Sequence, residues 1–197
     1  TRGMSSAASD VYKRQIETIN GTSIQARDIN NFWHCSDPFE FDALLRSSET
    51  RYKGNFFSYH GMLGYYASTG GGGRIGNQTT RFRRYPRRAG SENIPHLALN
   101  DKDANPDYLI TPGMWHTIQL VAYDGLVQYL MDGRVVYEIR YGDDVKVESE
   151  KSGKKSTAVI TYSRETFPAY NSGYFGIRMV ASHHQYRDLK VYRLNPK

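Results

Sequence analysis

The sequence contains very little cysteine: Cys35 is the single one among 197 residues, so no internal disulfide can form. It contains no run of about 20 apolar residues, so no membrane-spanning helix is predicted. It also lacks the Gly-x-Ser-x-Gly elbow of hydrolases, a phosphate-binding loop and a dinucleotide fingerprint. These absences argue against a helical membrane protein, an esterase-type nucleophile and a nucleotide-binding enzyme.

Paired carboxylates at glycosidase spacing are absent as well. Hydrolysis of a glycosidic bond normally uses two facing carboxylates. A laminarinase-type strand carries them as Glu-x-Asp-x-x-Glu, which does not occur here. The six histidines show no zinc-site spacing, and Cys35 has no cysteine partner. We therefore expect neither a bound metal nor a cofactor.

The sequence is rich in tyrosine, with 16 in all, and in positive charge, with a net value of +6 at pH 7. Tyrosine suits strands and surfaces that hold a partly polar ligand. A basic chain indicates an anionic partner: nucleic acid, a membrane surface or an acidic polysaccharide. Because no nucleic-acid-binding signature accompanies the charge, we favour an acidic polysaccharide or oligosaccharide, and expect no nucleic acid and no membrane partner.

Strand signals dominate the chain. Residues 115–140 contain three β-rich runs separated by Asp124-Gly125 and Asp132-Gly133, and Asp-Gly between such runs predicts a hairpin. This segment therefore predicts a three-stranded meander. Further strands are predicted at 15–19, 23–26, 61–68, 78–85, 173–180 and 185–194, the last two as a closing pair.

One helix is predicted over 38–46, with Asp37 as its N-cap, and the charged segment 143–156 is predicted to be a solvated loop. Residues 1–15 have no apolar periodicity, and SAASDVYKRQ looks like the adapter read-through found at the ends of metagenomic reading frames. We interpret 1–15 as a non-native or disordered leader. The expected fold is all-β: one sandwich of two antiparallel sheets over residues 16–197.

The densest basic cluster lies in TTRFRRYPRR. On a strand Arg81 and Arg83 share one face, while Phe82 and Arg84 share the other. Two guanidinium groups about 7 Å apart can bind carboxylates or sulfates bidentately. The alternative interpretation is a solvated strand end near Pro86.

A second cluster runs from Asn30 to His34 and includes Asn31 and Trp33. Amide and indole groups side by side suit sugar hydroxyls and ring faces, although these residues would equally suit a turn and a core. Elimination on uronic acids needs a cation to neutralise the substrate carboxylate and a base, often Tyr or His, to remove the C5 proton. The enriched residue types therefore favour a lyase over a hydrolase, if the protein is an enzyme.

Three segments, 28–38 (DINNFWHCSDP), 63–85 (ending TTRFRRY) and 172–194 (ending VYRL), resemble a bacterial concanavalin A-like family of unknown function found in polysaccharide degraders. The resemblance implies a jelly roll, secretion or export to the periplasm, and a fold-level analogy with jelly-roll polysaccharide lyases. Against that pattern, N-terminal strands before Arg27 are missing, Asn31 replaces a cysteine, and 143–156 is longer. We therefore expect an uncovered apolar strip at a sheet edge, or an intermolecular contact there.

These observations combine into one site hypothesis. We expect the protein to be a polysaccharide lyase that acts on an acidic glycan by β-elimination, the alternatives being a non-catalytic carbohydrate-binding module and a laminin-G-like adhesion domain. The concave sheet is expected to carry the site, although only one of Tyr65 and Tyr66 can face it, and we choose Tyr65. The proposed catalytic residues are Tyr65, His183 and Arg83, and the proposed substrate-binding residues are Asn31, Trp33, His60, Arg81 and Arg178.

Overall fold

The computed structural model describes residues 5–10, 18–19, 22–23, 28–36, 62–72, 76–86, 96–101, 106–111, 113–151, 154–179 and 184–194. Most of these residues lie in strands. The helical structure among them is a single short 3-10 turn at Pro106–Tyr108. The helix predicted over 38–46 lies outside the described residues.

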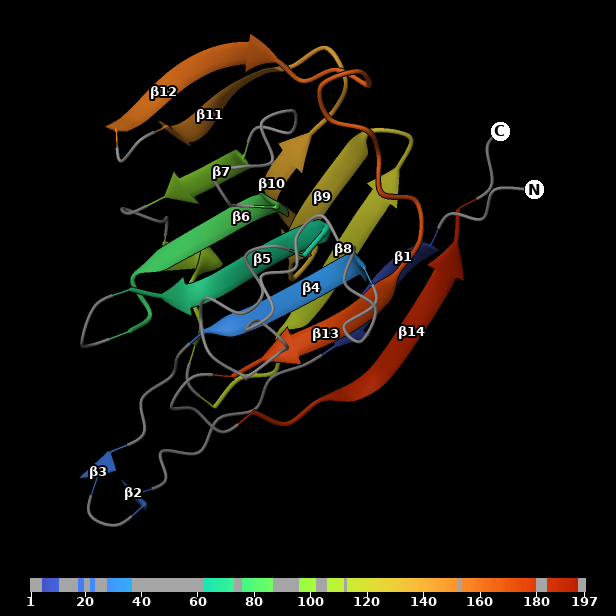
Figure 1. Cartoon of the computed structure of the whole chain (residues 1–197). Coiled ribbons are helices and arrows are strands. Elements are labelled where there is room, and N and C mark those ends of the chain that lie inside the picture. The colour runs from blue at the N-terminus through green and yellow to red at the C-terminus, as the bar shows by residue number, and fades with distance from the viewer. Residues whose placement is uncertain are drawn as a thin grey trace, which may run out of the picture.

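The first of the two large sheets has five antiparallel strands in the order β10-β9-β8-β1-β14 (Figure 1). Both Asp-Gly turns of the predicted meander have positive φ at each of their two residues, as type I′ hairpins require. The strands are β1 (Ser5–Asp10), β8 (Thr117–Tyr123), β9 (Leu126–Met131), β10 (Arg134–Ile139) and β14 (Arg187–Arg193).

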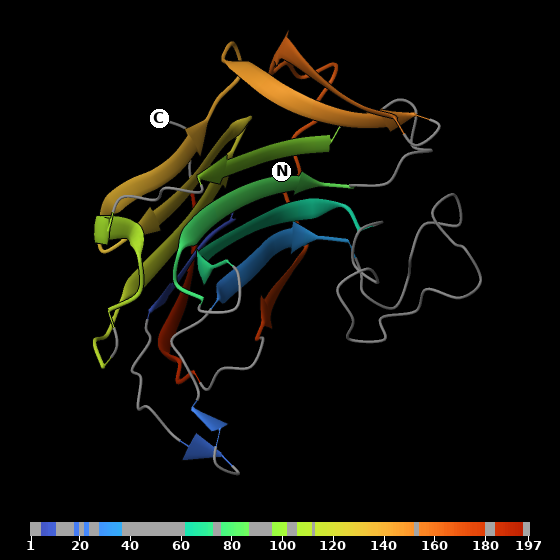
Figure 2. The same ribbon diagram turned by 90° about the vertical axis from the view of Figure 1, so that its left-hand side faces the viewer.

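The second sheet has seven antiparallel strands in the order β12-β11-β7-β6-β5-β4-β13, and it forms the other layer in Figure 2. A separate small hairpin pairs β2 (Thr18–Ile19) with β3 (Thr22–Ser23). The strands of the large sheet are β4 (Ile29–Cys35), β5 (Gly64–Gly71), β6 (Thr79–Tyr85), β7 (His96–Asp101), β11 (Asp144–Lys151), β12 (Lys154–Thr161) and β13 (Tyr174–Arg178).

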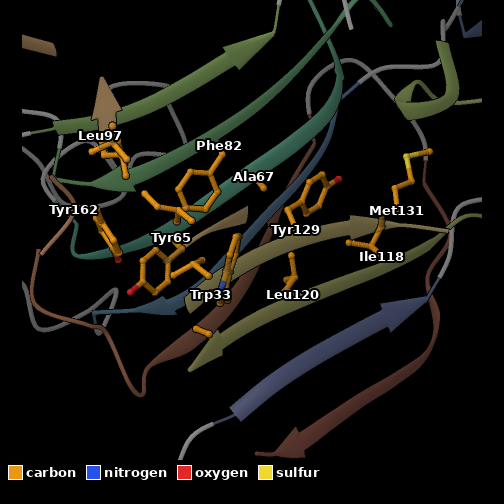
Figure 3. Packing of buried hydrophobic residues seen from close by; sticks show 14 of the residues in the cluster. Trp33, Tyr65, Ala67, Phe82, Leu97, Ile118, Leu120, Tyr129, Met131 and Tyr162 are labelled. Atoms are coloured by element: carbon orange, nitrogen blue, oxygen red, sulfur yellow. The ribbon is translucent and has the colours of Figure 1, made fainter. Parts of the chain in front are cut away.

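The core lies between the two sheets, where alternate residues of facing strands meet. Figure 3 shows Trp33, Tyr65 and Phe82 of the seven-stranded sheet gathered against Leu120 and Tyr129 of the five-stranded sheet. Each of these side chains is at most 1% exposed. Burial alternates regularly along β8 and β9, so one side of each strand faces the core and the other faces outward. The predicted all-β sandwich of two antiparallel sheets is confirmed.

The sequence analysis predicted a solvated loop over 143–156, and this prediction is wrong. Most of this segment belongs to the hairpin of β11 and β12, which are paired along their whole length. Val145 and Val147 are 5% exposed and belong to the core, whereas Asp144 before them and Lys146 between them are exposed. This is a period-2 pattern, and the density of charged residues concealed it.

Two further expectations are wrong. Ser5–Asp10, placed in an excluded leader, forms β1 and pairs with β8 on one side and β14 on the other. Main-chain hydrogen bonds hold such a strand without needing an apolar pattern of its own. The two closing strands are not a pair either, because β13 joins β4 in one sheet and β14 joins β1 in the other.

The strands β13 and β14 are edge strands of their sheets, and apolar side chains are exposed along them. Ile177 and Met179 are 40% and 55% exposed, and Leu189 and Val191 of β14 are 57% and 64% exposed. Ile177 lies opposite Asn31, and Val191 lies opposite Ala7, which pairs with the core residue Leu120. Both side chains thus point to the core side of their sheets, and the exposed apolar strip expected from the sequence is present at this edge.

Candidate functional site

The surface of interest is the outer face of the seven-stranded sheet, defined here as the face turned away from the five-stranded sheet. Side chains alternate between the two faces of a strand. Trp33, Tyr65 and Phe82 face the core, so their neighbours along the strands, Phe32, Tyr66 and Arg83, face outward. Phe32 and Tyr66 indeed belong to a second apolar cluster, separate from the core, with Cys35, Met62 and Tyr85.

Two rows of residues cross this face perpendicular to the strands. In the first row Arg178, Asn30, Ser68 and Arg81 are successive cross-strand partners on β13, β4, β5 and β6. In the second row Phe32, Tyr66 and Arg83 are partners on β4, β5 and β6. The face therefore carries three arginines together with amide, hydroxyl and aromatic groups.

The amide of Asn30 is the central connection of the first row. It is fully buried, and its Nδ2 donates hydrogen bonds to the main-chain oxygens of Asp28 (2.8 Å) and Arg178 (3.1 Å). Its Oδ1 accepts a hydrogen bond of 2.5 Å from the Tyr66 hydroxyl. Burial raises the pKa of Tyr66 to about 12, so this hydroxyl keeps its proton at neutral pH and acts as a donor.

Aromatic rings form the other end of the face. The ring of Tyr66 lies 4.8 Å from that of Phe32 and 6.1 Å from that of Tyr85, centroid to centroid. The guanidinium carbon of Arg83 lies 6.0 Å from the centroid of Tyr66. Arg83 is 8% exposed, so its charge acts in surroundings from which water is largely excluded. Burial also raises the pKa of the Cys35 thiol beside these rings to about 12, which leaves it unreactive.

On the core side, Arg84 fastens this end of the sheet to the segment that precedes β13. It is fully buried, its guanidinium carbon lies 4.1 Å from the Tyr170 ring centroid, and Nη2 donates to the Pro168 oxygen at 2.6 Å. Tyr170 in turn donates from its main-chain N–H to the Tyr65 hydroxyl and from its own hydroxyl to the Tyr85 oxygen. Arg84 is therefore structural and is separated from the outer face by the sheet.

Several predicted site residues are placed differently from the hypothesis. Tyr65 and Trp33 are core residues, 1% exposed each, with their rings 5.6 Å apart. Asn31 also faces the core, between Ala67 and Ile177 across the sheet. Their roles in catalysis or at the rim are not supported, because strand alternation puts them on the opposite face from Arg81 and Arg83.

Arg81, Arg83 and Arg178, by contrast, all lie on the outer face. His60 and His183 lie outside the described residues. The sequence analysis did not single out Ser68, and it chose Asn31 and Tyr65 where Asn30 and Tyr66 face outward. Because side chains alternate along a strand, one residue of each of the pairs Asn30-Asn31 and Tyr65-Tyr66 must face outward. The cross-strand register is needed to decide which one.

His34 and His116 have structural partners. His116 Nε2 accepts from the Thr111 N–H (2.9 Å) and Nδ1 faces Asp132 Oδ2 (2.7 Å). His34 Nδ1 lies 2.6 Å from the Tyr170 oxygen. Within the described ranges, no group of three or more His, Cys, Asp or Glu side chains is arranged to hold a metal ion. None of the helical structure there has the length and apolar character of a membrane span.

Comparison with known proteins places the chain in a family. Residues 3–149 match the model described as "Domain of unknown function (DUF6250)", which accounts for most of the chain. The chain belongs to the DUF6250 family. The matched part of this DUF6250 protein runs from β1 into β11, so it includes Asn30, Tyr66, Arg81 and Arg83, while Arg178 lies beyond it.

A crystal structure of a protein of unknown function with a galectin-like fold, from Bacillus subtilis, is similar in structure with a TM-score of 0.47. Its sequence is 15% identical, and the match covers 98% of the DUF6250 chain and 74% of the Bacillus subtilis chain. A search of curated protein sequences gave no match.

Proposed function

We propose that the outer face of the seven-stranded sheet binds an acidic glycan, with Arg81, Arg83 and Arg178 as the groups that receive its carboxylates. The observation that carries the proposal is that these three arginines lie on one face of the sheet, among aromatic and amide side chains. Guanidinium groups bind carboxylates bidentately. Aromatic rings and amides are the partners that sugar faces and hydroxyls use.

The spacing of the arginines fits a chain of sugars rather than a single small anion. Arg81 and Arg83 are two residues apart on β6, which places their Cα atoms about 7 Å apart. Arg178 lies three strands away from Arg81 in the same row, about 14 Å at the usual strand spacing. A ligand that reaches both ends must extend across the sheet, as an oligosaccharide does.

Eliminative cleavage is the second candidate function, favoured by the position of Arg83 beside Tyr66. An arginine that neutralises the uronate carboxylate acidifies the C5 proton. A base then removes this proton, C4 and C5 become doubly bonded, and the C4–O bond breaks with its oxygen taking a proton. Because burial raises its pKa to about 12 and its hydroxyl donates to Asn30 Oδ1, Tyr66 does not serve as that base.

Binding assays on a panel of uronate polymers and matched neutral glycans test the proposal. The Arg81→Met variant should bind uronate polymers about tenfold more weakly, because it loses a guanidinium group that binds a carboxylate. Arg193→Met, on exposed β14 of the other sheet, is the control with the same change in net charge and should bind normally. Equal weakening by both variants would contradict a defined site.

The same panel separates the two candidate functions. A rise in ultraviolet absorbance from an unsaturated uronate product would establish elimination. Binding without any such product would leave a carbohydrate-binding module. No binding to any acidic glycan would contradict the proposal as a whole.

A further inference from the structure

The two large sheets end in four edge strands, and three of these carry features that protect an edge from pairing with another chain. The edges are β12 and β13 in the seven-stranded sheet and β10 and β14 in the five-stranded sheet. The pairing of β10, β13 and β14 with their neighbours is interrupted in each case by a register shift. All three also carry charged residues, among them Arg134, Arg178 and Lys190. Irregular pairing and charge both hinder the association of edge strands.

The fourth edge, β12, lacks the irregularity and carries charge at one end only. It pairs with β11 over eight consecutive residues without a register shift. Its charged residues, Lys154 and Lys155, occupy the first two positions, and Thr157–Thr161 is uncharged. In Figure 1 β12 lies at the outer end of its sheet, and among the described strands only β11 pairs with it. Its other edge therefore presents N–H and C=O groups to any strand that can align with it.

The side chains of this stretch are accessible as well. Val159 is 62% exposed, and Thr157, Ala158 and Thr161 are also exposed. A strand that arrives at this edge would meet threonine and valine side chains. Such β-branched residues fit the pleated surface of a sheet and pair favourably across strands.

The stretch has the same chemical pattern when it is read from either end. It is Thr-Ala-Val-Ile-Thr, with Val159 at the centre. Two copies aligned antiparallel about Val159 place Thr157 opposite Thr161 of the second copy, Ala158 opposite Ile160, and Val159 opposite itself. Apolar residues then face apolar residues, hydroxyls face hydroxyls, and no like charges meet. A shift of one residue would instead bring side chains of opposite sheet faces together.

We infer that β12 is the interface of a symmetric homodimer, in which the β12 strands of two copies pair antiparallel about Val159 and join their seven-stranded sheets into one. A twofold interface needs a patch that is complementary to itself, and Thr157–Thr161 meets this requirement. Because the described part of the chain has one such edge, association stops at two copies. A single strand pair buries little surface, so the dimer should dissociate on dilution.

Analytical ultracentrifugation of the full chain over a range of concentrations tests the inference. The wild-type mass should rise with concentration to that of two chains. Val159→Lys places two lysines opposite each other at the twofold axis and should raise the dimer dissociation constant at least about tenfold. Val135→Lys is the matched control, because Val135 is exposed on the edge strand β10 and the charge change is the same. This control should dimerise like the wild type.

Two double variants test the register of the pairing. Thr157→Lys combined with Thr161→Lys places lysines of the two copies opposite each other, so the dimer should be lost. Thr157→Glu combined with Thr161→Lys places each glutamate opposite a lysine, so the dimer should persist. Equal association of the two double variants would contradict the register centred on Val159.

Hydrogen exchange supplies a measurement on the wild-type protein alone. Amide exchange within Thr157–Thr161 should slow as the protein concentration rises, because the pairing adds main-chain hydrogen bonds there. Circular dichroism shows whether each variant is folded. A wild-type protein that stays monomeric at every concentration, that associates beyond two copies, or that dimerises equally well as Val159→Lys would overturn the inference. A monomer would leave this edge to a strand of a different protein.

Discussion

Neighbouring arginines on β6 illustrate how one residue type serves two purposes. Arg81 and Arg83 face outward, whereas Arg84 is fully buried on the core side between the rings of Tyr170 and Phe167. Such a buried guanidinium is retained only where aromatic faces and main-chain oxygens receive its charge. Loss of the buried arginine should therefore harm folding, and loss of an outward arginine should harm binding.

We predict that Arg84→Met lowers the free energy of unfolding by about 2–4 kcal/mol, because the cation–π contacts and the hydrogen bond to Pro168 disappear together. Arg81→Met, three positions earlier on the opposite face, should change stability by less than about 0.5 kcal/mol. Urea unfolding followed by circular dichroism measures both. Equal stability of the two variants would show that Arg84 does not fasten this end of the sheet.

The two adjacent asparagines of β4 give a second comparison. Asn31 is fully buried with neither side-chain atom hydrogen-bonded to a described residue, whereas the Asn30 amide makes three hydrogen bonds. Asn31→Leu should raise the free energy of unfolding by about 1 kcal/mol, and Asn30→Leu should lower it by about 2 kcal/mol. Chemical denaturation of both variants is the measurement. A destabilised Asn31→Leu protein would contradict the assignment of Asn31 as an unpaired core amide.

Adjacent residues on one strand show which features of the site a single sequence can predict. TTRFRRY was sufficient to place Arg81 and Arg83 on one face and Arg84 on the other, because alternation within a strand is local. Choosing between Tyr65 and Tyr66 required the register between β5 and β6, which pairs Tyr66 with Arg83. Register depends on contacts between distant segments, so a single sequence does not determine it.

At the scale of elements, turn chemistry decided which strands could be predicted. The meander of β8, β9 and β10 was correctly predicted because Asp-Gly turns specify hairpins locally. The hairpin of β11 and β12 was missed because its charges resemble a solvated loop. The partners of β13 and β14 were also missed, since strands adjacent in sequence entered different sheets.

The β11–β12 hairpin provides an element-scale prediction. Val147 on β11 is 5% exposed, while Val159 on β12 is 62% exposed. Val147→Ala should cost about 1–2 kcal/mol of unfolding free energy, and Val159→Ala should cost less than about 0.5 kcal/mol. Thermal or urea unfolding of the two variants measures the difference. Similar small effects at both positions would mean that the hairpin does not pack on the core.

Across the whole molecule, buried tyrosines make the fold sensitive to alkali. Burial raises the pKa of Tyr66 and Tyr170 from 10.0, and of Cys35 from 9.0, to about 12 in each case. Because the unfolded chain loses these protons more readily, stability should be constant below pH 9 and should fall between pH 9 and 12. Denaturation midpoints measured across that range test this.

Tyrosinate absorbance supplies the control for the alkaline transition. Ionisation of the buried tyrosines should appear together with the loss of β-sheet circular dichroism. If all 16 tyrosines ionised near pH 10 while the sheets remained intact, the burial of these side chains would be contradicted.

The position of β1 between β8 and β14 has a consequence for biosynthesis. During translation β1 leaves the ribosome long before either of its neighbours, β8 and β14. The five-stranded sheet therefore cannot be completed until β14 has been synthesised. Pairings so distant in sequence form slowly, and until they do β1 remains available to chaperones or to β8 and β14 of another nascent chain.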